Sequence, residues 1–331
     1  MKKSFKKILV VSHDAGGAEI ISAYIKRFQK KNNFSIIISG PAEKIFLTKK
    51  IKVPRLDFVS GADPKILLTK VKPDLVLTST SWQTTTEKDF VAAAKVLQIK
   101  TAVYLDHWIN YRERFGYPSR DWKNNVPDEI WVGDGEALVM AKGLGFPKVK
   151  LVRNEYFVEL KEKIKKLKPR PKNSGQKTIL FISEPISVGA QKKFGNPRYW
   201  GFTEHNVLND LCNLLVKIQS VQKTQWNLVI RKHPSDAPDS YDQIIRKFAP
   251  KINIAYSTIP DLVSEIAVVD LIVGMDSVAL VIGLLAKKKV MSYIPGRKKK
   301  CSLPFKTLIK VKNQTELYAC LGPYLGLVKK V

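Results

Sequence analysis

The chain has 331 residues, which is too long for one ordinary compact domain and suits two. Its hydrophobic fraction of 44% is normal for a globular protein, but 57 Lys and Arg against 29 Asp and Glu give a formal net charge of +28. This charge favours anionic partners such as phosphates, nucleotides, acidic glycans or membranes, although a Lys-rich solvated surface would produce it as well.

The first half of the chain opens with a basic stretch and a short apolar run, Ile8 to Val11, which is too short for the core of a signal peptide. Short β-branched runs then alternate with amphipathic stretches of helical length, as in a parallel sheet covered on both faces. Strands are predicted over Lys7–Ser12, Phe34–Ser39, Leu75–Ser79, Thr101–Leu105 and Glu129–Gly133. Helices are predicted over Ala15–Lys31, with Asp14 as its cap, Thr84–Leu97 and Gly135–Lys142.

The composition changes in the middle of the chain. A charged helix is predicted over Glu155–Leu167, and the Pro-, Gly- and Lys-containing residues 168–175 have the composition of a linker. The earlier pattern then resumes, with strands predicted over Lys177–Ser183, Asn227–Lys232, Asn253–Tyr256, Val269–Val273 and Lys289–Tyr293. Helices are predicted over Glu204–Val221, Asp239–Phe248, a short stretch after Pro260, Ser277–Ala286 and Thr315–Leu321, the last of these stopping before Gly322-Pro323.

The two halves therefore predict an α/β protein of two Rossmann-like domains, residues 1–154 and 177–331, joined by a charged helix and linker over 155–176. Two such domains, each with a parallel sheet, would face each other across a cleft. The stretch from Ile266 to Ala286 is long enough to cross a membrane, but it contains Asp270 and Asp276, which each cost about 2.5–3.5 kcal/mol at a bilayer centre. We interpret it as a buried strand, a turn and a helix.

The cysteines and the basic runs bear on where the protein works. Cys212, Cys301 and Cys320 form neither a CxxC motif nor an even-numbered framework, so a reduced, cytoplasmic setting fits best. Lys298-Lys299-Lys300 is most simply a solvated loop; its alternative is contact with an acidic glycan or with the inner face of an anionic membrane. No specific nucleic-acid partner is expected, because no RNP, KH, zinc or helix-turn-helix signature is present.

A polar loop, Gly274-Met275-Asp276-Ser277, joins a buried strand to a helix in the second half. The free backbone N–H groups at the start of a helix form an anion pocket, a Ser hydroxyl adds a donor, and Gly permits close approach, so the loop suits a phosphate. The alternative is that Asp276 is only the N-cap of the helix.

Another polar segment, Arg231-Lys232-His233-Pro234, ends a strand of the same half. His233 can donate to a phosphate as a leaving group gains charge, or it can simply hydrogen-bond locally. Successive strand residues point to opposite faces, so only one of Arg231 and Lys232 should reach a ligand. Glu184 follows the first strand of this half and can contact a donor molecule, or it can simply belong to a turn. Residues 189–202 have no periodicity, as in a lid or a disordered loop.

In the first half, His13 and Asp14 follow the first strand and precede Gly16 and Gly17. A carboxylate or imidazole here can act as general base on an acceptor hydroxyl, and Glu19, one helical turn further on, can face the same opening. The glycine pair would let a substrate or another domain approach the backbone closely. The alternative is that Asp14 caps the helix and Glu19 faces solvent.

A dense polar and aromatic loop follows the strand Thr101–Leu105, which is typical of a binding loop. An aromatic side chain could stack on a sugar, and an arginine could pair with an acidic acceptor. The residues concerned are Asp106, His107, Trp108, Tyr111, Arg112 and Arg114. A rigid structural loop is an equal alternative, and no metal site is expected, since Asp106 and His107 alone rarely suffice as ligands.

These motifs resemble those of a known superfamily over nearly the whole chain. The segments concerned are Ser12-His13-Asp14-Ala15-Gly16-Gly17-Ala18-Glu19, Asp106-His107-Trp108, Trp131-Val132-Gly133-Asp134, Arg231-Lys232-His233-Pro234 and Gly274-Met275-Asp276-Ser277. The chain resembles the GT-B glycosyltransferases and nucleotide-sugar epimerases, most closely the polysaccharide-biosynthesis proteins of bacteria and archaea. The His-Pro pair is also similar to that of bacterial sialyltransferases and polyol-phosphate transferases. The resemblance implies a nucleotide phosphate on the C-terminal domain and an acceptor on the N-terminal one.

One position departs from the pattern, because many GT-B proteins carry a Glu that binds the donor ribose where this chain has Ile282. The leading hypothesis is a metal-independent glycosyltransferase without a cofactor, which moves a sugar from a nucleotide-sugar donor to a glycan or lipid-linked acceptor in cell-envelope polysaccharide biosynthesis. A nucleotide-sugar 2-epimerase or hydrolase is the second hypothesis. A binding protein that kept the fold and lost catalysis is the third, and Ile282 motivates it.

Overall fold

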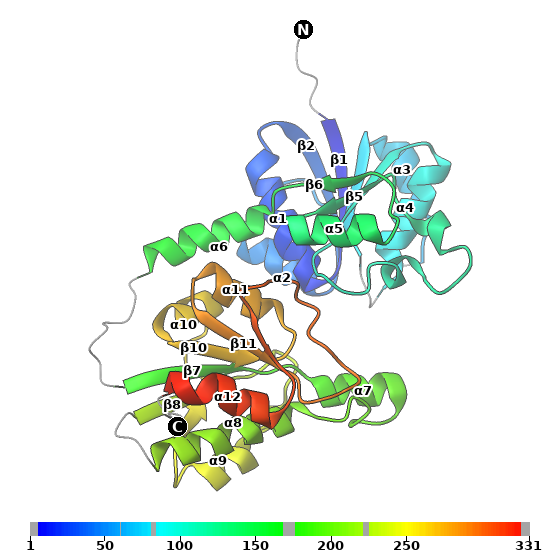
Figure 1. Ribbon diagram of the computed structural model, residues 1–331. Coiled ribbons are helices and arrows are strands. Elements are labelled where there is room, and N and C mark those ends of the chain that lie inside the picture. The colour runs from blue at the N-terminus through cyan, green and yellow to red at the C-terminus, as the bar shows by residue number, and fades with distance from the viewer. Residues whose placement is uncertain (1–5, 60, 81–83, 168–175, 221–224, 326–331) are drawn as a thin grey trace. The chain divides into compact units, whose positions relative to one another are not determined.

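Two six-stranded parallel sheets organise the described part of the chain, which in this computed structural model comprises residues 6–59, 61–80, 84–167, 176–220 and 225–325 (Figure 1). The chain divides into two compact units, Met1–Glu159 (unit 1) and Leu160–Val331 (unit 2), and each contains one of the sheets. The predicted α/β class with two parallel sheets is therefore confirmed. The predicted linker, residues 168–175, lies outside the described residues, and the cleft stays a prediction.

The sheet of unit 1 has the strand order β2-β1-β3-β4-β5-β6. Its strands are β1 (Lys6–Ser12), β2 (Asn32–Ile38), β3 (Leu75–Ser79), β4 (Lys100–Tyr104), β5 (Glu129–Val132) and β6 (Val149–Leu151). The helices are α1 (Ala15–Phe28), α2 (Pro41–Thr48), α3 (Pro64–Val71), α4 (Thr86–Val96), α5 (Gly135–Gly143) and α6 (Glu155–Lys166), with short 3₁₀ turns at Glu113–Phe115 and Trp122–Asn125. Helix α6 begins in unit 1 and ends in unit 2.

Both faces of this sheet are buried, which explains why its strands are continuous apolar runs. On β1, Ile8 and Val10 pack with residues of α1 and α2, whereas Leu9 and Val11 pack on the other face with residues of α3 and α4. This alternation follows from the two-residue period of a strand. Burying one such side chain stabilises the fold by about 1.5–3 kcal/mol, so the run fixes the position of β1 in the sheet.

The sheet of unit 2 has the order β12-β11-β10-β7-β8-β9. Its strands are β7 (Gln176–Ile182), β8 (Gln225–Arg231), β9 (Asn253–Tyr256), β10 (Leu271–Gly274), β11 (Lys289–Tyr293) and β12 (Ile309–Val311). The helices are α7 (Ile186–Phe194), α8 (Glu204–Gln219), α9 (Asp242–Phe248), α10 (Leu262–Val268), α11 (Val278–Leu285) and α12 (Gln314–Leu325). In Figure 1, α10 and α11 lie above the strands of this sheet and α8 and α9 below them.

The structure corrects several of the predicted boundaries. Helix α1 ends at Phe28 rather than Lys31, and part of the segment predicted to be irregular, 189–202, belongs to α7. Helix α12 does not stop before Gly322-Pro323 but continues to Leu325. Pro323 sits in the last turn, and Leu321 and Leu325 on either side of it are buried in the core. Their burial outweighs the hydrogen bond that the proline cannot donate.

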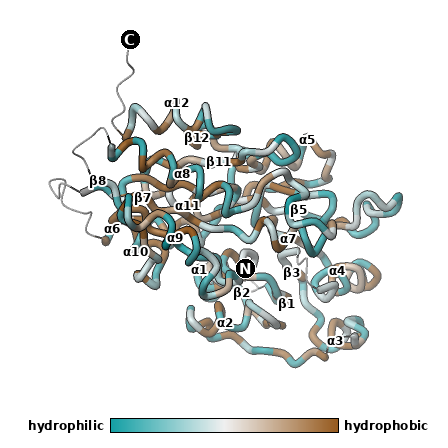
Figure 2. The backbone as a smooth tube through the Cα atoms, turned by 90° about the horizontal axis from the view of Figure 1, so that it is seen from below, coloured by the Kyte–Doolittle hydropathy of each residue, from teal (hydrophilic) through white to brown (hydrophobic). Residues whose placement is uncertain are grey.

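The segment predicted to be a buried strand, turn and helix is confirmed as the end of α10, then β10 and α11. Helix α11 is apolar along its length, as its mostly brown colour in Figure 2 shows, because it is buried against β10 and β11. It has only eight residues. Among the described residues, no helix combines the length and the apolarity that a bilayer crossing needs.

Each sheet has one point at which the strand order reverses. In unit 1 the chain passes from β1 to β2 on one side and later to β3 on the other, so the reversal lies between β1 and β3. In unit 2 it lies between β7 and β10 for the same reason. Ligands of open α/β sheets bind at the carboxyl ends of the strands beside such a switch point. The two switch points are therefore where a functional site is to be sought.

Candidate functional site

A histidine–aspartate pair follows β1 at the switch point of unit 1. His13 Nδ1 and Asp14 Oδ1 lie 2.7 Å apart, and both side chains are less than one-fifth exposed. Asp14 is the N-cap residue of α1, as predicted, but its side chain makes no capping hydrogen bond and pairs with His13 instead. A carboxylate on Nδ1 favours the tautomer whose Nε2 accepts a proton, as in a general base.

The ring of His13 lines a pocket of about 370 Å³. The polar or aromatic side chains that share this pocket are Ser39, Arg55, Asp57, Phe58, Thr84 and Thr86. The ring also packs against Gly40, where an added Cβ would lie 2.5 Å from Nε2. Gly40 has φ +56°, a conformation that favours glycine, so this residue type is required both by the backbone and by the imidazole. The pocket has the polarity and size to hold a hydroxyl-bearing group beside the base.

A buried glutamate lies behind the His13–Asp14 pair. Glu87, in the first turn of α4, is 1% exposed. Its Oε1 accepts hydrogen bonds from Ser79 Oγ, at 3.0 Å, and from the backbone N–H of His13, at 3.2 Å. Burial raises its pKa to about 8, against the lowering effect of the Ser79 hydrogen bond, and nearby Asp14 adds to the rise. Glu87 is therefore mostly protonated at neutral pH and can donate a proton.

No pattern in the sequence singles out Glu87, because an acidic residue in the first turn of a helix is ordinarily a solvent-exposed favourable charge. Only the packing of α4 against the ends of β1 and β3 makes it unusual. Its Oε2 has no hydrogen-bond partner among the described residues, and neither do Ser12 Oγ and Thr78 Oγ1 on the adjoining strands. Buried polar atoms without partners are rare and mark places that water or a ligand completes.

The glycines at the start of α1 have a different role from the predicted one. A Cβ on Gly16 would lie 2.2 Å from Asp106 Oδ2, and a Cβ on Gly17 would lie 1.9 Å from Ser79 Oγ. The space above these glycines is thus filled by side chains of the protein itself, which corrects the expectation of a substrate there. Asp106 Oδ1 pairs with Arg114 Nη1 at 2.6 Å, so this carboxylate joins the start of α1 to the loop after β4.

Several other predicted acceptor residues hold unit 1 together instead. Trp108 is 4% exposed and donates its indole N–H to Asp134, and Tyr111 is 2% exposed, so neither ring face is available for a sugar. Arg112 donates to the Leu144 carbonyl from both Nε and Nη2. His107 Nδ1 accepts the backbone N–H of Trp108.

Glu19 forms an ion pair of 2.7 Å with Lys49. Lys49 also lies 3.4 Å from Glu159, so Glu19 belongs to a small ion-pair network on α1, α2 and α6. Glu19 therefore lies in an ion-pair network, whereas the prediction placed it at the same opening as His13. Its predicted role as a base remains untested, and the His13–Asp14 pair is the better placed candidate.

The switch point of unit 2 also holds a buried carboxyl group. Glu184 follows β7 and accepts the backbone N–H groups of Met275 and Asp276, at the end of β10. Burial raises its pKa to about 7 in spite of these hydrogen bonds. Asp276 in turn accepts from the backbone N–H and the hydroxyl of Ser302, at 2.7 and 2.9 Å, and pairs with Lys299 at 3.0 Å.

The N-cap of α11 is Ser277, not Asp276: Ser277 Oγ accepts the backbone N–H of Ala279 at 3.2 Å. The carboxylate of Asp276 instead positions Lys299, a residue that the sequence indicated as part of a solvated loop. Gly274 is needed for packing, since a Cβ there would lie 3.0 Å from Leu280 Cδ2 and 3.2 Å from the Ile182 carbonyl oxygen. Ile282, at the position of the ribose-binding glutamate, is 4% exposed and packs in α11.

The turn after β8 is fastened to the end of β7. Asp236 accepts the backbone N–H of His233 at 2.8 Å and the hydroxyl of Ser183 at 2.7 Å. His233 Nδ1 lies 2.7 Å from Ser235 Oγ, and burial lowers the pKa of its imidazole. His233, Glu184 and Ser277 thus follow three adjacent strands, β8, β7 and β10, at the same edge of the sheet.

Arg231, in contrast, is a structural residue. Its Nη1 pairs with Glu265 at 2.6 Å and also donates to the Ile259 carbonyl, and Nη2 donates to the Pro260 carbonyl. Glu265 is 2% exposed, so the guanidinium neutralises a buried charge. These contacts of Nη1 and Nη2 favour a structural role for Arg231, and its predicted phosphate contact stays a prediction.

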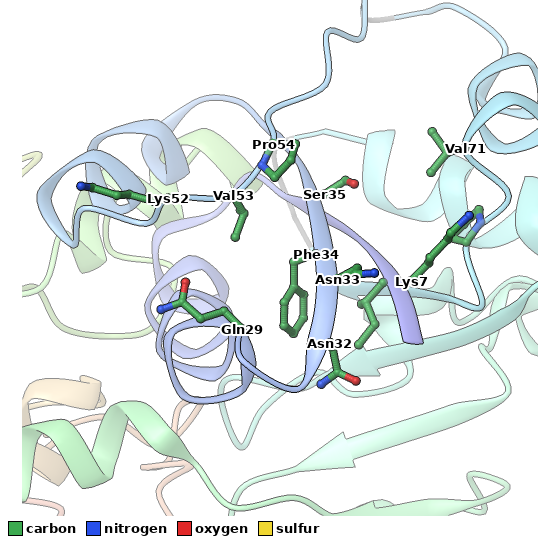
Figure 3. A pocket seen from close by; sticks show the side chains of 12 residues that line it. Lys7, Gln29, Asn32, Asn33, Phe34, Ser35, Lys52, Val53, Pro54 and Val71 are labelled. Carbon is green, nitrogen blue, oxygen red and sulfur yellow. The ribbon is translucent and has the colours of Figure 1, made fainter. Parts of the chain in front are cut away.

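A further hollow of unit 1, of about 490 Å³, lies at the opposite end of the sheet. It is lined by residues at the start of β1 and β2, among them Lys7, Asn32 and Phe34, and by Gln29 at the end of α1 (Figure 3). Amino ends of parallel strands are not where ligands of this architecture bind, so we leave it apart from the candidate site. Within the described ranges, no three His, Cys, Asp or Glu side chains form a metal-binding group.

Comparison with known proteins places this geometry in a fold. No protein-family model and no curated protein matches the chain. Among solved structures, S. aureus MnaA with UDP matches with a TM-score of 0.61 at 14% identity, over 97% of this chain and 88% of that one. UDP-GlcNAc 2-epimerase from Neisseria meningitidis bound to UDP-GlcNAc matches with a TM-score of 0.65 at 14% identity, over 96% and 91%. MurG from Acinetobacter baumannii matches with a TM-score of 0.55 at 11% identity, over 97% and 91%. The chain therefore has the GT-B fold, as its motifs indicated.

Proposed function

We propose that the protein is a metal-independent enzyme that acts on a nucleotide sugar, and that it transfers the sugar to a hydroxyl of a glycan or lipid-linked acceptor in cell-envelope polysaccharide biosynthesis. The observation that carries this proposal is the His13–Asp14 pair beside a pocket at the switch point of unit 1. The UDP and UDP-GlcNAc bound in the structural neighbours support a nucleotide sugar as the substrate.

The donor diphosphate is assigned to the carboxyl edge of the unit 2 sheet. The positive end of the α11 dipole favours an anion beside Ser277, although the Ser277 side chain already accepts the N–H of Ala279 and its carbonyl accepts the N–H of Leu280. His233 follows β8 on the same edge and can donate to the departing phosphate. Lys299, held by Asp276, adds a positive charge nearby, so basic groups and a helix start supply what a metal ion supplies elsewhere.

The transfer step is assigned to unit 1. His13 Nε2 would take the proton of the acceptor hydroxyl while Asp14 stabilises the imidazolium that forms. The acceptor oxygen would then bond to the anomeric carbon of the donor as the bond from that carbon to the phosphate oxygen breaks. The nucleoside diphosphate would leave with the electron pair, stabilised at the start of α11. Such base catalysis contributes about 10²–10⁴-fold to a rate.

A pair of substitutions at Ser277 tests the donor site. Asp and Asn are both good N-caps, so Ser277→Asp and Ser277→Asn should fold alike, but only the first places a negative charge where the phosphate is proposed to bind. Titration of UDP, GDP and CMP by calorimetry should show binding of at least one to the wild type. That binding should weaken about 100-fold or more in Ser277→Asp, because like charges repel, and much less in Ser277→Asn. Equal affinities of the two variants would refute the assignment.

The second candidate function is that of a nucleotide-sugar 2-epimerase or hydrolase. The protonated Glu87 beside His13 favours it, because an epimerase needs an acid as well as a base. Incubating UDP-GlcNAc with the protein in deuterated water, without acceptor, separates the two. Deuterium at C2 of the sugar, or free UDP, would support the epimerase or hydrolase. Turnover that depends on an added acceptor would support the transferase, and nucleotide binding without any turnover would support a non-catalytic binding protein.

A further inference from the structure

Unit 2 has a concave site on other strands than those that carry the candidate nucleotide site. A hollow of about 640 Å³ lies at the carboxyl ends of β11 and β12, and we call it the basic pocket. Its floor includes the buried residues Ile294 and Val311, joined by a backbone hydrogen bond of 3.0 Å. Its charged lining consists of Arg297, Lys299, Lys300, Lys310, Lys312 and Glu316.

The positive charges of the basic pocket are largely uncompensated. Lys299 pairs with Asp276, but among the described residues Arg297, Lys300, Lys310 and Lys312 make no ion pair. The acidic residue Glu316 is occupied locally, because its carboxylate accepts the backbone N–H of Lys312 and the side chain of Asn313. These four cations without an ion pair, gathered around one hollow, repel each other unless an anion joins them.

The walls of the basic pocket are held in place before any ligand binds. A Cβ on Gly296 would lie 2.6 Å from the Trp200 carbonyl oxygen, so the loop after β11 packs closely on the segment after α7. Lys298 lies 4.9 Å from the ring centroid of Tyr199, and Tyr199 stacks on Phe194. A lining whose backbone is fixed in this way loses less entropy on binding a ligand than a mobile lysine-rich loop would.

We propose that the basic pocket binds a phosphate monoester or diphosphate group of a second ligand, distinct from the nucleotide assigned to Ser277. A single carboxylate would leave most of the positive charge unmatched, whereas a phosphate monoester or diphosphate carries about two or three negative charges and several acceptor oxygens. The hollow has the size of a small molecule, and its apolar floor suits the body that bears the phosphate. Lys299 lies between this pocket and Asp276, which precedes Ser277, so the protein can hold two phosphate-bearing groups side by side.

The experiment uses inorganic pyrophosphate as the probe and the full chain as the protein, in the presence of saturating UDP. The double variant Lys310→Gln/Lys312→Gln removes two charges from the pocket. Lys251→Gln/Lys287→Gln removes the same charge from exposed residues that precede β9 and β11, at the amino ends of the strands. We expect pyrophosphate affinity to fall about tenfold or more in the pocket variant and less than about twofold in the control, because only the first pair lies close enough to contact the anion.

Cys301 provides a local readout, because it lines the pocket and is partly exposed. In a Cys320→Ser background, pyrophosphate should slow the alkylation of Cys301 in the wild type and not in the pocket variant. Loss of affinity that is equal in the pocket and control variants, or alkylation that pyrophosphate does not slow, would overturn the proposal. Thermal melts of both variants confirm that each remains folded.

Two further measurements, competition with UDP and sedimentation with vesicles, distinguish this proposal from its alternatives. If no nucleotide binds, the proposed function fails while the pyrophosphate titration still reports on the basic pocket. If UDP displaces pyrophosphate completely, the two anions share one site and the present proposal is wrong. Sedimentation with phosphatidic acid vesicles, against vesicles of neutral lipid, then assigns the source of the phosphate. Binding that Lys310→Gln/Lys312→Gln abolishes indicates a lipid-borne phosphate, and no binding indicates a soluble phosphate ester.

Discussion

The switch points of the two units hold the same kind of residue in opposite states of hydrogen bonding. In unit 2, Glu184 accepts two backbone N–H groups, and Asp276 is satisfied by Ser302 and Lys299. In unit 1, Glu87 keeps one oxygen without a partner among the described residues, as do the hydroxyls of Ser12 and Thr78. One switch point is closed by the protein's own contacts, and the other still has buried polar atoms to satisfy.

This difference indicates a division of labour between the units. A saturated network is rigid, and it suits a site that holds a ligand in one position. Unsatisfied groups next to a histidine and a protonated carboxyl suit a site where protons move. We therefore expect substitutions in unit 1 to affect turnover and its pH dependence, and substitutions in unit 2 to affect binding and stability.

The largest effect is expected at His13. His13→Ala removes the proposed base, so turnover of whichever nucleotide sugar the titrations identify should fall by about 10²–10⁴-fold, while nucleotide affinity stays within about twofold. Steady-state kinetics and calorimetry measure the two quantities. His205→Ala, in unit 2, is the control, because that ring contacts the Ser240 carbonyl, Tyr241 and Glu204 and none of the proposed site residues. Turnover that survives in His13→Ala would remove unit 1 from the chemistry.

The next largest effect concerns Arg231, which we place in the scaffold of unit 2. Arg231→Met leaves Glu265 buried without its partner and should lower the free energy of unfolding by about 3 kcal/mol. Nucleotide affinity of the folded variant should be unchanged. Lys232→Met is the matched control, since Lys232 donates to a single exposed carbonyl, and it should cost less than about 1 kcal/mol. Denaturant titration gives both values; an affinity lost with little change in stability would restore the phosphate role of Arg231.

A smaller effect is expected from Glu87, through the pH dependence of stability. The pKa of Glu87 is about 8 in the folded protein and about 4.5 when the carboxyl is exposed, because burial disfavours its charge. The folded state therefore holds the proton more tightly, and the stability of the wild type falls as pH rises from about 4.5 to about 8. Glu87→Gln removes this fall and should gain stability on the wild type across that range, by at most about 5 kcal/mol, because one pKa unit corresponds to about 1.4 kcal/mol.

Chemical denaturation of wild type and Glu87→Gln at several pH values measures this gain. Glu136→Gln is the control, because Glu136 is an exposed glutamate in the first turn of α5, the same kind of position as that of Glu87 in α4. Its stability should track that of the wild type at every pH. A Glu87→Gln curve parallel to the wild type would mean that Glu87 is ionised when folded, and the proposed acid would be lost.

The smallest effect is expected from Glu184, the counterpart of Glu87 in unit 2. The pKa of Glu184 is raised only to about 7, so its destabilising effect on the folded protein develops between pH 4.5 and about 7. Glu184→Gln keeps an oxygen for the backbone N–H groups and should gain at most about 3 kcal/mol above that window, less than Glu87→Gln. The same denaturation series compares the two. A larger gain for Glu184→Gln would reverse the contrast between the switch points.

Much of this fold could be predicted from the sequence, because continuous apolar runs such as Ile8 to Val11 identify strands buried on both faces. Elements with little burial were missed. Strand β6 is mostly exposed, β12 has three residues, and α2, α3 and α7 are short helices whose few buried residues produce little periodicity. Their positions depend on tertiary contacts that a local pattern does not contain.

The site could be predicted only where it follows strand ends. His13, Glu184, His233 and Ser277 lie at strand ends that the sequence marked, because polar residues interrupt apolar runs there. Glu87 could not be found in this way, since its burial depends on how α4 packs. The burial of aromatic residues such as Trp108 could not be predicted, because a ring that packs inside a loop and one that stacks on a sugar have the same sequence pattern.

The absence of a side chain at Gly40 matters for protein engineering and for the identification of distant relatives. It has no side chain and belongs to no motif, yet the imidazole of His13 packs directly against its backbone. Introducing a single methyl group at this position would act as a wedge that turns the ring away from Asp14 while leaving every polar residue of the site intact. We therefore expect Gly40→Ala to disable the proposed base, and a relative with a bulkier residue at that position would display all the motifs without a working His13–Asp14 pair.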